Sequence, residues 1–199
     1  MSSFKMHVAI SEKVRSELNY SNLFILGSVL PDIIKLIVKD RTSTHFENNN
    51  SIDLEKYILA QDNLKNELVV GYYAHLIEDK IWFESYLDKK YRKFKEYSDE
   101  KIYNDYAFID NIMYKKLNFN TQGIRKILLE SIDATDVKAI NLMNCKSEEL
   151  INNKSVKEKI KEVWKDYKSD NNIYFFTMND AEEYYELASR KVKEYIEKI

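Results

Sequence analysis

The sequence predicts an all-α protein, a single-domain bundle of about seven to nine helices. The first observation is the scarcity of turn-forming residues, since 199 residues contain one proline and three glycines. A β-sandwich, a barrel or a wound parallel sheet needs more of them at its turns. The second observation is that apolar residues recur at helical spacing along most of the chain. The length is sufficient for one domain with a full hydrophobic core.

The first two expected helices are short and apolar on one side. In the first, from His7 to about Leu18, the inner side carries Val8 and Val14. The second covers residues 24–38 and contains the only proline of the chain. A proline disfavours helix in the residue before it and fits the first turn of a new helix. We therefore expect a break at Leu30–Asp32, followed by a polar loop over residues 39–51.

Longer amphipathic segments make up the rest of the chain. A helix from Asp53 to about Lys93, interrupted near Gln61–Asn63, contains a proline-free stretch rich in apolar residues. This stretch is predicted to be helical, and it contains the residues of the first candidate site. Thr177 and Asp180 resemble a capping box for the last helix. The remaining expected helices cover residues 98–118, 121–133, 147–167 and 180–199.

Composition argues against several classes of protein. Net charge is −2 with an isoelectric point near 6.0, and charges of both signs are interspersed, so electrostatic nucleic-acid binding is not indicated. Cys145 is the only cysteine, which excludes an internal disulfide and suggests a small apolar filler. The longest apolar runs, 22–30 and 68–77, are shorter than the roughly 20 residues of a membrane span. With no signal-peptide pattern at the start, we expect a soluble cytoplasmic protein.

The stretch Gly71–Trp82 carries the first candidate site. His75 and Asp79 are four residues apart, so their side chains project from one helix face on adjacent turns. Gly71 lies one turn earlier on that face, and a glycine inside a helix suggests a close approach by another element. An imidazole and a carboxylate so placed can bind one metal ion. The alternative is an ordinary half-buried histidine paired with an aspartate.

Three further residues outside this stretch are candidates. His7 lies near the start of the first helix, where we expect it to be partly exposed, and a surface histidine is the alternative. Asp32 lies among apolar residues, where an unpaired carboxylate is costly to bury. It either caps its helix or points at a cation. His45, in the segment Thr44-His45-Phe46, is either a ligand or a solvated loop residue.

Asp105 and Asp110 belong to the helix expected over residues 98–118. Asp110 lies between Ile109 and Ile112 and is a candidate to face inward. For both aspartates the alternative is a solvated helix face. Both are kept as candidate metal ligands.

Taken in order, these segments resemble the zinc-dependent phospholipase C family, whose helical fold is shared with P1-type single-strand nucleases. The resemblance is to its short bacterial members and covers about the first 115 residues. The later helices match only in a general way. The segments that carry it are Met6–Ala9, Leu26–Asp32, Thr44–Phe46, Gly71–Trp82, and Tyr103–Asp105 with Asp110.

The resemblance implies a metal-dependent phosphodiesterase, phospholipase C-like, with Asp32 and Asp79 as catalytic carboxylates. It implies that one metal is held by Asp32, His45, His75 and Asp79. Asp79 would bridge to a second metal bound by His7, and a water between the ions would attack the phosphorus. Zinc fits the mixture of ligand types, and iron and manganese are also compatible with it. One or two ions are expected.

The chain departs from the family at the usual third metal site. It has no histidine after His75, whereas other members carry further histidines there. Asp105, Asp110 or Glu78 are the candidates to replace part of that site. Glu78 ranks last, because it points about 100° away from Asp79 on the same helix.

Two other classes of function compete with the hydrolase. One is a non-catalytic helical module that retains a structural metal and binds a partner. The other is an HD-type phosphohydrolase, which normally has an adjacent His-Asp dipeptide, and this sequence has none. A phospholipid or a small phosphoester is the expected substrate, and the sequence leaves the oligomeric state undefined. Metal stoichiometry and an open coordination position discriminate an enzyme from a structural module.

Overall fold

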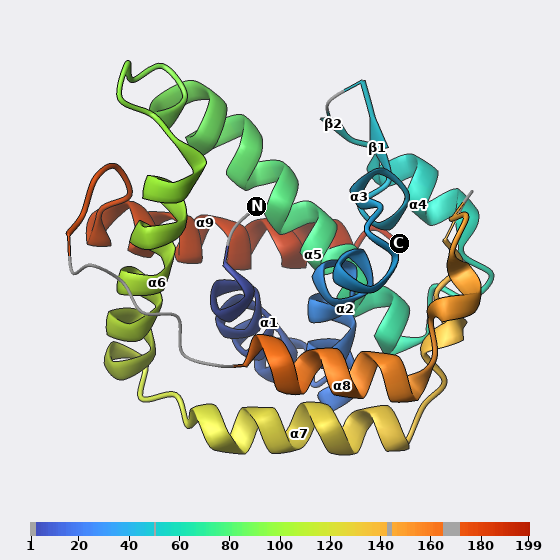
Figure 1. Cartoon of the computed structure of the whole chain (residues 1–199). Coiled ribbons are helices and arrows are strands. Elements are labelled where there is room, and N and C mark those ends of the chain that lie inside the picture. Colours follow the sequence, from blue (N-terminus) through green and yellow to red (C-terminus); the bar gives the residue numbers. More distant parts are fainter. Residues whose placement is uncertain (1–2, 50, 143–144, 165–171) are drawn as a thin grey trace.

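The structure is a computed structural model that describes residues 3–49, 51–142, 145–164 and 172–199 (Figure 1). Within these residues nine α-helices and one small hairpin form, which confirms the all-α prediction. The α-helices are α1 (Phe4–Leu18), α2 (Asn22–Val38), α3 (Arg41–Thr44), α4 (Leu54–Ala60), α5 (Glu67–Ile81), α6 (Asp99–Lys116), α7 (Thr121–Asp133), α8 (Asn153–Val163) and α9 (Met178–Ile196). The other elements are strands β1 (Glu47–Asn48) and β2 (Ser51–Ile52), the π-helix η1 (Trp82–Tyr91) and the 3₁₀ turns η2 (Val137–Ala139) and η3 (Glu148–Leu150).

Each α-helix begins after a residue whose short polar side chain accepts a hydrogen bond from the first turn. Ser3 accepts from the backbone N–H of Met6 at the start of α1, and Asn66 does the same for α5. Such caps satisfy backbone donors that have no partner inside the helix. For α9, Thr177 and Asp180 bond to each other's backbone, so the predicted capping box is confirmed.

Helices α2 and α5 cross at very short range and form the most extensive interface of the fold. A Cβ atom added to Gly71 would lie 2.1 Å from the carbonyl oxygen of Phe24. One added to Gly27 would lie 2.2 Å from the carbonyl oxygen of Leu68. Only glycine permits this approach, so the close contact predicted at Gly71 is confirmed. The crossing brings the polar residues of the two helices together.

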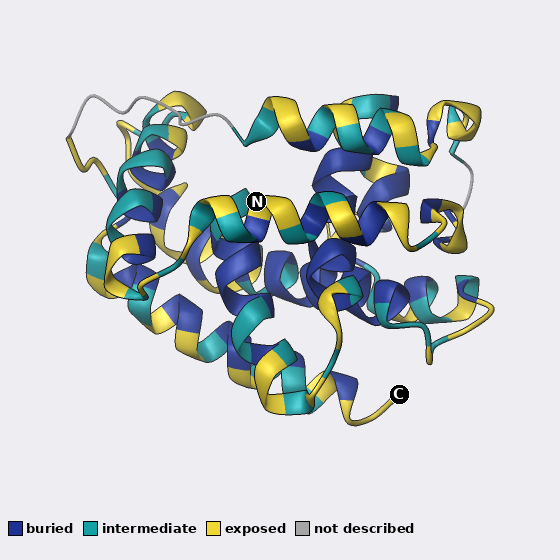
Figure 2. Cartoon of the chain, turned by 90° about the horizontal axis from the view of Figure 1, so that it is seen from below, coloured by how far each residue is buried: buried dark blue, intermediate teal, exposed yellow. Residues whose placement is uncertain are grey.

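The other helices enclose this pair. Helix α1 lies between α2 and α9, and α9 also packs against α5 (Figure 1). Helices α7 and α8 lie side by side and cover a further face of α2. Figure 2 shows the result, with buried residues concentrated on the inner helices and exposed residues on the outward faces. The polar side chains of these helices that face inward, among them His7, Asp32, His75 and Asp79, are therefore buried.

The predicted break at Leu30–Asp32 is wrong, because α2 continues through Pro31 without interruption. Proline removes one backbone donor and crowds the carbonyl one turn earlier. Here the segment from Phe24 to Ile34 is buried throughout, and packing of this apolar helix outweighs the local preference. Asp32 consequently lies inside the helix and not at a cap.

Three other expected segments can be compared with the structure. The predicted polar loop at residues 39–51 contains α3 and the β1–β2 hairpin, in which Glu47 pairs with Ile52. The interruption predicted near Gln61–Asn63 is confirmed, since α4 ends at Ala60 and α5 begins at Glu67, and the last part of the segment over residues 53–93 is the π-helix η1. Of the helix expected over residues 147–167, only α8 forms, after the 3₁₀ turn η3, and residues 165–167 lie outside the described residues.

Candidate metal centre

Five of the predicted site residues meet where α1, α2 and α5 pack against the end of α3. They are His7 on α1, Asp32 on α2, His45 just after α3, and His75 and Asp79 on α5. Two groups among them have ligand atoms close enough to hold a metal ion. One group is Asp32, His45 and His75, and the other is His7, His75 and Asp79.

The distances within the first group, and from its two histidines to Asp79, are comparable to those between ligands of one metal ion. The Nε2 atoms of His45 and His75 lie 3.3 Å apart. His45 Nε2 is 3.5 Å from Asp32 Oδ1 and 3.6 Å from Asp79 Oδ2. His75 Nε2 is 3.8 Å from Asp79 Oδ2. Ligand atoms placed tetrahedrally around zinc at about 2.0–2.1 Å are about 3.3 Å from one another.

The remaining ring nitrogens of this group are hydrogen-bonded, which assigns the tautomers. His75 Nδ1 donates to the carbonyl of Ser28 at 2.7 Å. The hydroxyl of Thr44 donates to the backbone carbonyl of Asp40, so its oxygen accepts from His45 Nδ1 at 2.9 Å. Both Nε2 atoms therefore carry lone pairs, and these face each other at hydrogen-bonding distance. A cation between them fits this arrangement, and bonded Nδ1 atoms are usual in metal-binding histidines.

Burial favours the protonation states that ligands need. It lowers the pKa of His45, and it lowers the pKa of His75 well below its ordinary value, so both rings are neutral at pH 7. Burial would raise the pKa of Asp32, but the pKa lies well below its usual range, and the adjacent Lys35 ammonium favours this ionised form. Neutral imidazoles and ionised carboxylates are the forms that bind divalent metals.

Two cationic side chains contact the carboxylates of the centre. Lys35 Nζ lies 2.7 Å from Asp32 Oδ1, and Arg41 Nη2 lies 2.9 Å from Asp79 Oδ2. Arg41 also bonds Glu47 at 2.6 Å and lies over the ring of Phe83. These contacts place positive charge on the side of the centre that is nearest to solvent.

His7 is fully buried, so the expectation of partial exposure is wrong. Helix α1 is enclosed by α2 and α9, and the ring points inward instead of toward water. Its Nδ1 lies 2.6 Å from Glu78 Oε2, and its Nε2 lies 3.4 Å from Asp79 Oδ1. Burial alone would lower the pKa of His7, but these two carboxylates raise it to about 10.

The other two candidate aspartates are buried but have different partners. Both carboxylate oxygens of Asp105 accept hydrogen bonds from the backbone N–H groups of residues 174–176, at 2.7–2.8 Å. Asp110 accepts from the hydroxyl of Ser3 at 2.5 Å. Neither belongs to the two ligand groups found among the described residues. The alternative of a solvated helix face is wrong for both, since Asp105 is 0% and Asp110 7% exposed.

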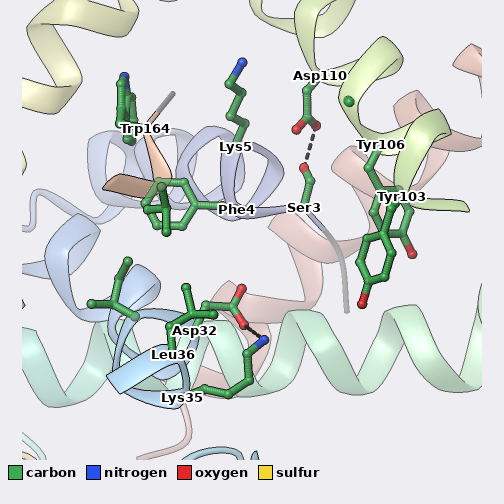
Figure 3. Close-up of a pocket in the computed structure, with 13 residues that line it drawn as sticks. Ser3, Phe4, Lys5, Asp32, Lys35, Leu36, Tyr103, Tyr106, Asp110 and Trp164 are labelled. Carbon is green, nitrogen blue, oxygen red and sulfur yellow. Dashed lines mark hydrogen bonds and ion pairs between the residues drawn. The ribbon is translucent and has the colours of Figure 1, made fainter. Parts of the chain in front are cut away.

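An apolar pocket of about 250 Å³ adjoins the centre (Figure 3). Asp32 and Lys35 form one wall, and the Ser3–Asp110 pair lies opposite. Among the five central residues Asp32 alone lines this pocket, and it is 5% exposed whereas the other four are 0% exposed. The Asp32 side is therefore where solvent and small molecules come nearest to the centre. The apolar lining includes Phe4, Leu36, Tyr103 and Trp164.

Sequence reasoning did not assign roles to Lys35 and Arg41, and it ranked Glu78 last. Lys35 was detectable in principle, since it follows Asp32 by three residues on one helix face. Glu78 points away from Asp79 along α5, but α1 passes on that side and brings His7 to it. Arg41 reaches Asp79 across 38 positions of sequence, and no local pattern indicates that contact.

Comparison with known proteins finds no matching family model, no similar curated protein and no similar solved structure. The resemblance to the phospholipase C family therefore stays a prediction from the sequence motifs. No described helix combines the length and hydropathy required to cross a bilayer. Within the described residues, the structure thus defines an all-α protein whose buried His/Asp groups could hold a metal ion.

Proposed function

We propose that this protein is a metal-dependent hydrolase of phosphoesters, most similar in chemistry to the zinc-dependent phospholipases C. One observation carries the proposal. Two neutral imidazoles direct Nε2 lone pairs at each other across 3.3 Å, with two carboxylates at matching distances. Two buried lone pairs that face each other at this distance are unfavourable unless a cation or a donor lies between them. The order of the motifs in the sequence supports the same conclusion.

Asp32, His45, His75 and Asp79 are the proposed ligands. Their mixture of nitrogen and oxygen donors fits zinc, and it is also compatible with iron or manganese. A divalent cation in such a set supplies a Lewis acid for a phosphoryl oxygen and lowers the pKa of water near it. The hydrogen bonds from His45 to Thr44 and from His75 to Ser28 keep the rings in one orientation.

The surrounding side chains suit a phosphoester. Lys35 and Arg41 lie against the two carboxylates, where they can stabilise negative charge on phosphoryl oxygens. Asp32 borders the pocket, so its carboxylate is placed to accept a hydrogen bond from an attacking water. The apolar pocket accommodates an apolar alcohol portion of the substrate. A small phosphoester or a phospholipid with such a group is the proposed substrate class.

The test combines metal content with hydrolysis. The purified protein is expected to contain a divalent metal and to cleave bis(p-nitrophenyl) phosphate in a reaction that a chelator stops and added metal restores. Asp32→Asn should lose most of this activity. The matched control Asp133→Asn changes an exposed aspartate paired with Lys157 and should leave activity unchanged. Cleavage that persists after full chelation would contradict the proposal.

A second candidate is a structural centre without turnover. The four proposed donors would fill a four-ligand shell, and three of them are 0% exposed. Structural zinc sites have closed four-ligand shells, whereas catalytic sites keep a position open. Stoichiometric metal with no cleavage of any phosphoester tested, including monoesters and phospholipid vesicles, would favour this candidate.

A further inference from the structure

The two candidate ligand groups are not independent, because both contain His75. A histidine can serve two ions only if each ring nitrogen faces one of them. His75 Nδ1 is hydrogen-bonded to the carbonyl of Ser28 at 2.7 Å, so only Nε2 is directed into the centre. That atom is 3.3 Å from His45 Nε2, within the first group. If His75 binds the ion of the first group, only His7 and Asp79 remain as ligands in the second group.

Ring geometry also separates His7 from the first group. The rings of His7 and His75 are stacked, with centroids 3.9 Å apart and planes inclined by 24°. The lone pairs of imidazole nitrogens lie in the ring plane. The lone pairs of two stacked rings therefore lie in two nearly parallel planes. The rings of His45 and His75 meet at 68°, with centroids 5.2 Å apart. This edge-on relationship allows two Nε2 atoms to converge on one point.

Both nitrogens of His7 already face carboxylates. Glu78 Oε2 is 2.6 Å from Nδ1, and Asp79 Oδ1 is 3.4 Å from Nε2. On its other oxygen, Asp79 is bonded to Arg41. The side chains of His7 and Arg41 thus hold the carboxylate of Asp79 from two directions. His7 faces Oδ1 of Asp79, the oxygen on the side where a second ion would bind, whereas Arg41 bonds Oδ2, the oxygen that faces His45 and His75.

We propose that the centre takes one divalent cation, held by Asp32, His45, His75 and Asp79, and that His7 is a positioning residue. Held by Glu78, it fixes the orientation of Asp79 through a hydrogen bond. This inference rests on the proposed metal centre and defines its stoichiometry. It assigns His7 a role different from that of the second-metal ligand implied by the sequence resemblance.

The test is a titration of metal-depleted protein with Co²⁺, followed by calorimetry and by visible absorption of the bound ion. The wild-type protein is expected to bind one equivalent. His7→Gln should also bind one equivalent with an unchanged absorption band and an affinity about 10–100-fold lower. The matched variant His45→Gln should change the band, because it alters a ligand. His7→Leu should weaken binding more than His7→Gln, because leucine cannot donate to Asp79.

Glu78→Gln provides a variant that changes no histidine, in case substitutions at His7 impair folding. It should retain one equivalent and the wild-type absorption band. Two equivalents in the wild-type protein, falling to one in His7→Gln, would overturn the single-ion centre while leaving the hydrolase proposal intact. One equivalent without phosphoester cleavage would leave the single-ion centre standing and refute the hydrolase. Absence of binding would refute both.

Discussion

The Nε2 atoms of His45 and His75 lie 3.3 Å apart in the interior, and the hydrogen bonds of both Nδ1 atoms leave these two nitrogens as acceptors. This relationship predicts that a divalent cation stabilises the fold. At a concentration about 100 times its dissociation constant, a ligand adds about 2.7 kcal/mol to the free energy of unfolding. For a protein of this size, that corresponds to a rise of several degrees in the melting temperature.

Thermal unfolding in saturating zinc and in chelator measures this effect. His75→Ala should melt at the same temperature in both conditions, because it removes a ligand. Equal melting temperatures for the wild-type protein with zinc and with chelator would contradict the ligand assignment.

Gly71→Ala should destabilise the protein by about 3 kcal/mol or more, because the new Cβ would lie 2.1 Å from the carbonyl oxygen of Phe24. That oxygen belongs to the backbone of α2 and can move only if the two helices separate. Gly123→Ala is the control, since its nearest neighbour is the side chain of Asn120 at 3.0 Å. It should change stability by about 1 kcal/mol or less. Urea unfolding of both variants measures the difference, and similar losses would contradict the close crossing.

Asp105→Asn should destabilise the protein by about 1–3 kcal/mol without reducing metal content. The carboxylate accepts three backbone hydrogen bonds from residues 174–176, and an amide can retain only part of them. Asp99→Asn, at the exposed start of the same helix, is the matched control and should cost less. Denaturant unfolding and elemental analysis are the measurements. Loss of metal from correctly folded Asp105→Asn would make Asp105 a ligand after all.

Asp110 should make the protein less stable as pH rises from about 4 to about 7. Burial raises the pKa of Asp110 from 3.8 to about 7, with the Ser3 hydroxyl opposing the shift. Between these values the folded protein holds one proton more than the unfolded chain. The contribution of Asp110 to the free energy of unfolding therefore falls by up to about 1.4 kcal/mol per pH unit, and it levels off above pH 7.

Asp110→Asn isolates this contribution, because the amide does not titrate and its oxygen can still accept from Ser3. The free energy of unfolding is measured with urea at several pH values for both proteins. As pH rises, that of the wild type should fall relative to that of the variant. A difference that stays constant from pH 4.5 to 7.5 would contradict the raised pKa.

Helical periodicity and the scarcity of glycine and proline were sufficient to predict the fold class and most helices. The helix expected over residues 121–133 forms with those bounds, and the capping box of α9 forms as predicted. Both depend on interactions within a few residues, which are visible in sequence. The break expected at Pro31 failed because burial of α2 on several sides outweighed a local preference.

For the site, the sequence by itself determined which side chains carry ligand chemistry: three histidines and a few aspartates in apolar segments. Only the tertiary structure decided their partners. Glu78 faces His7 because α1 passes that side of α5, and Arg41 reaches Asp79 from a separate helix. Asp105 instead binds the backbone before α9. These pairings depend on how helices distant in sequence pack, and packing is set by the shape of the whole core instead of by any local spacing.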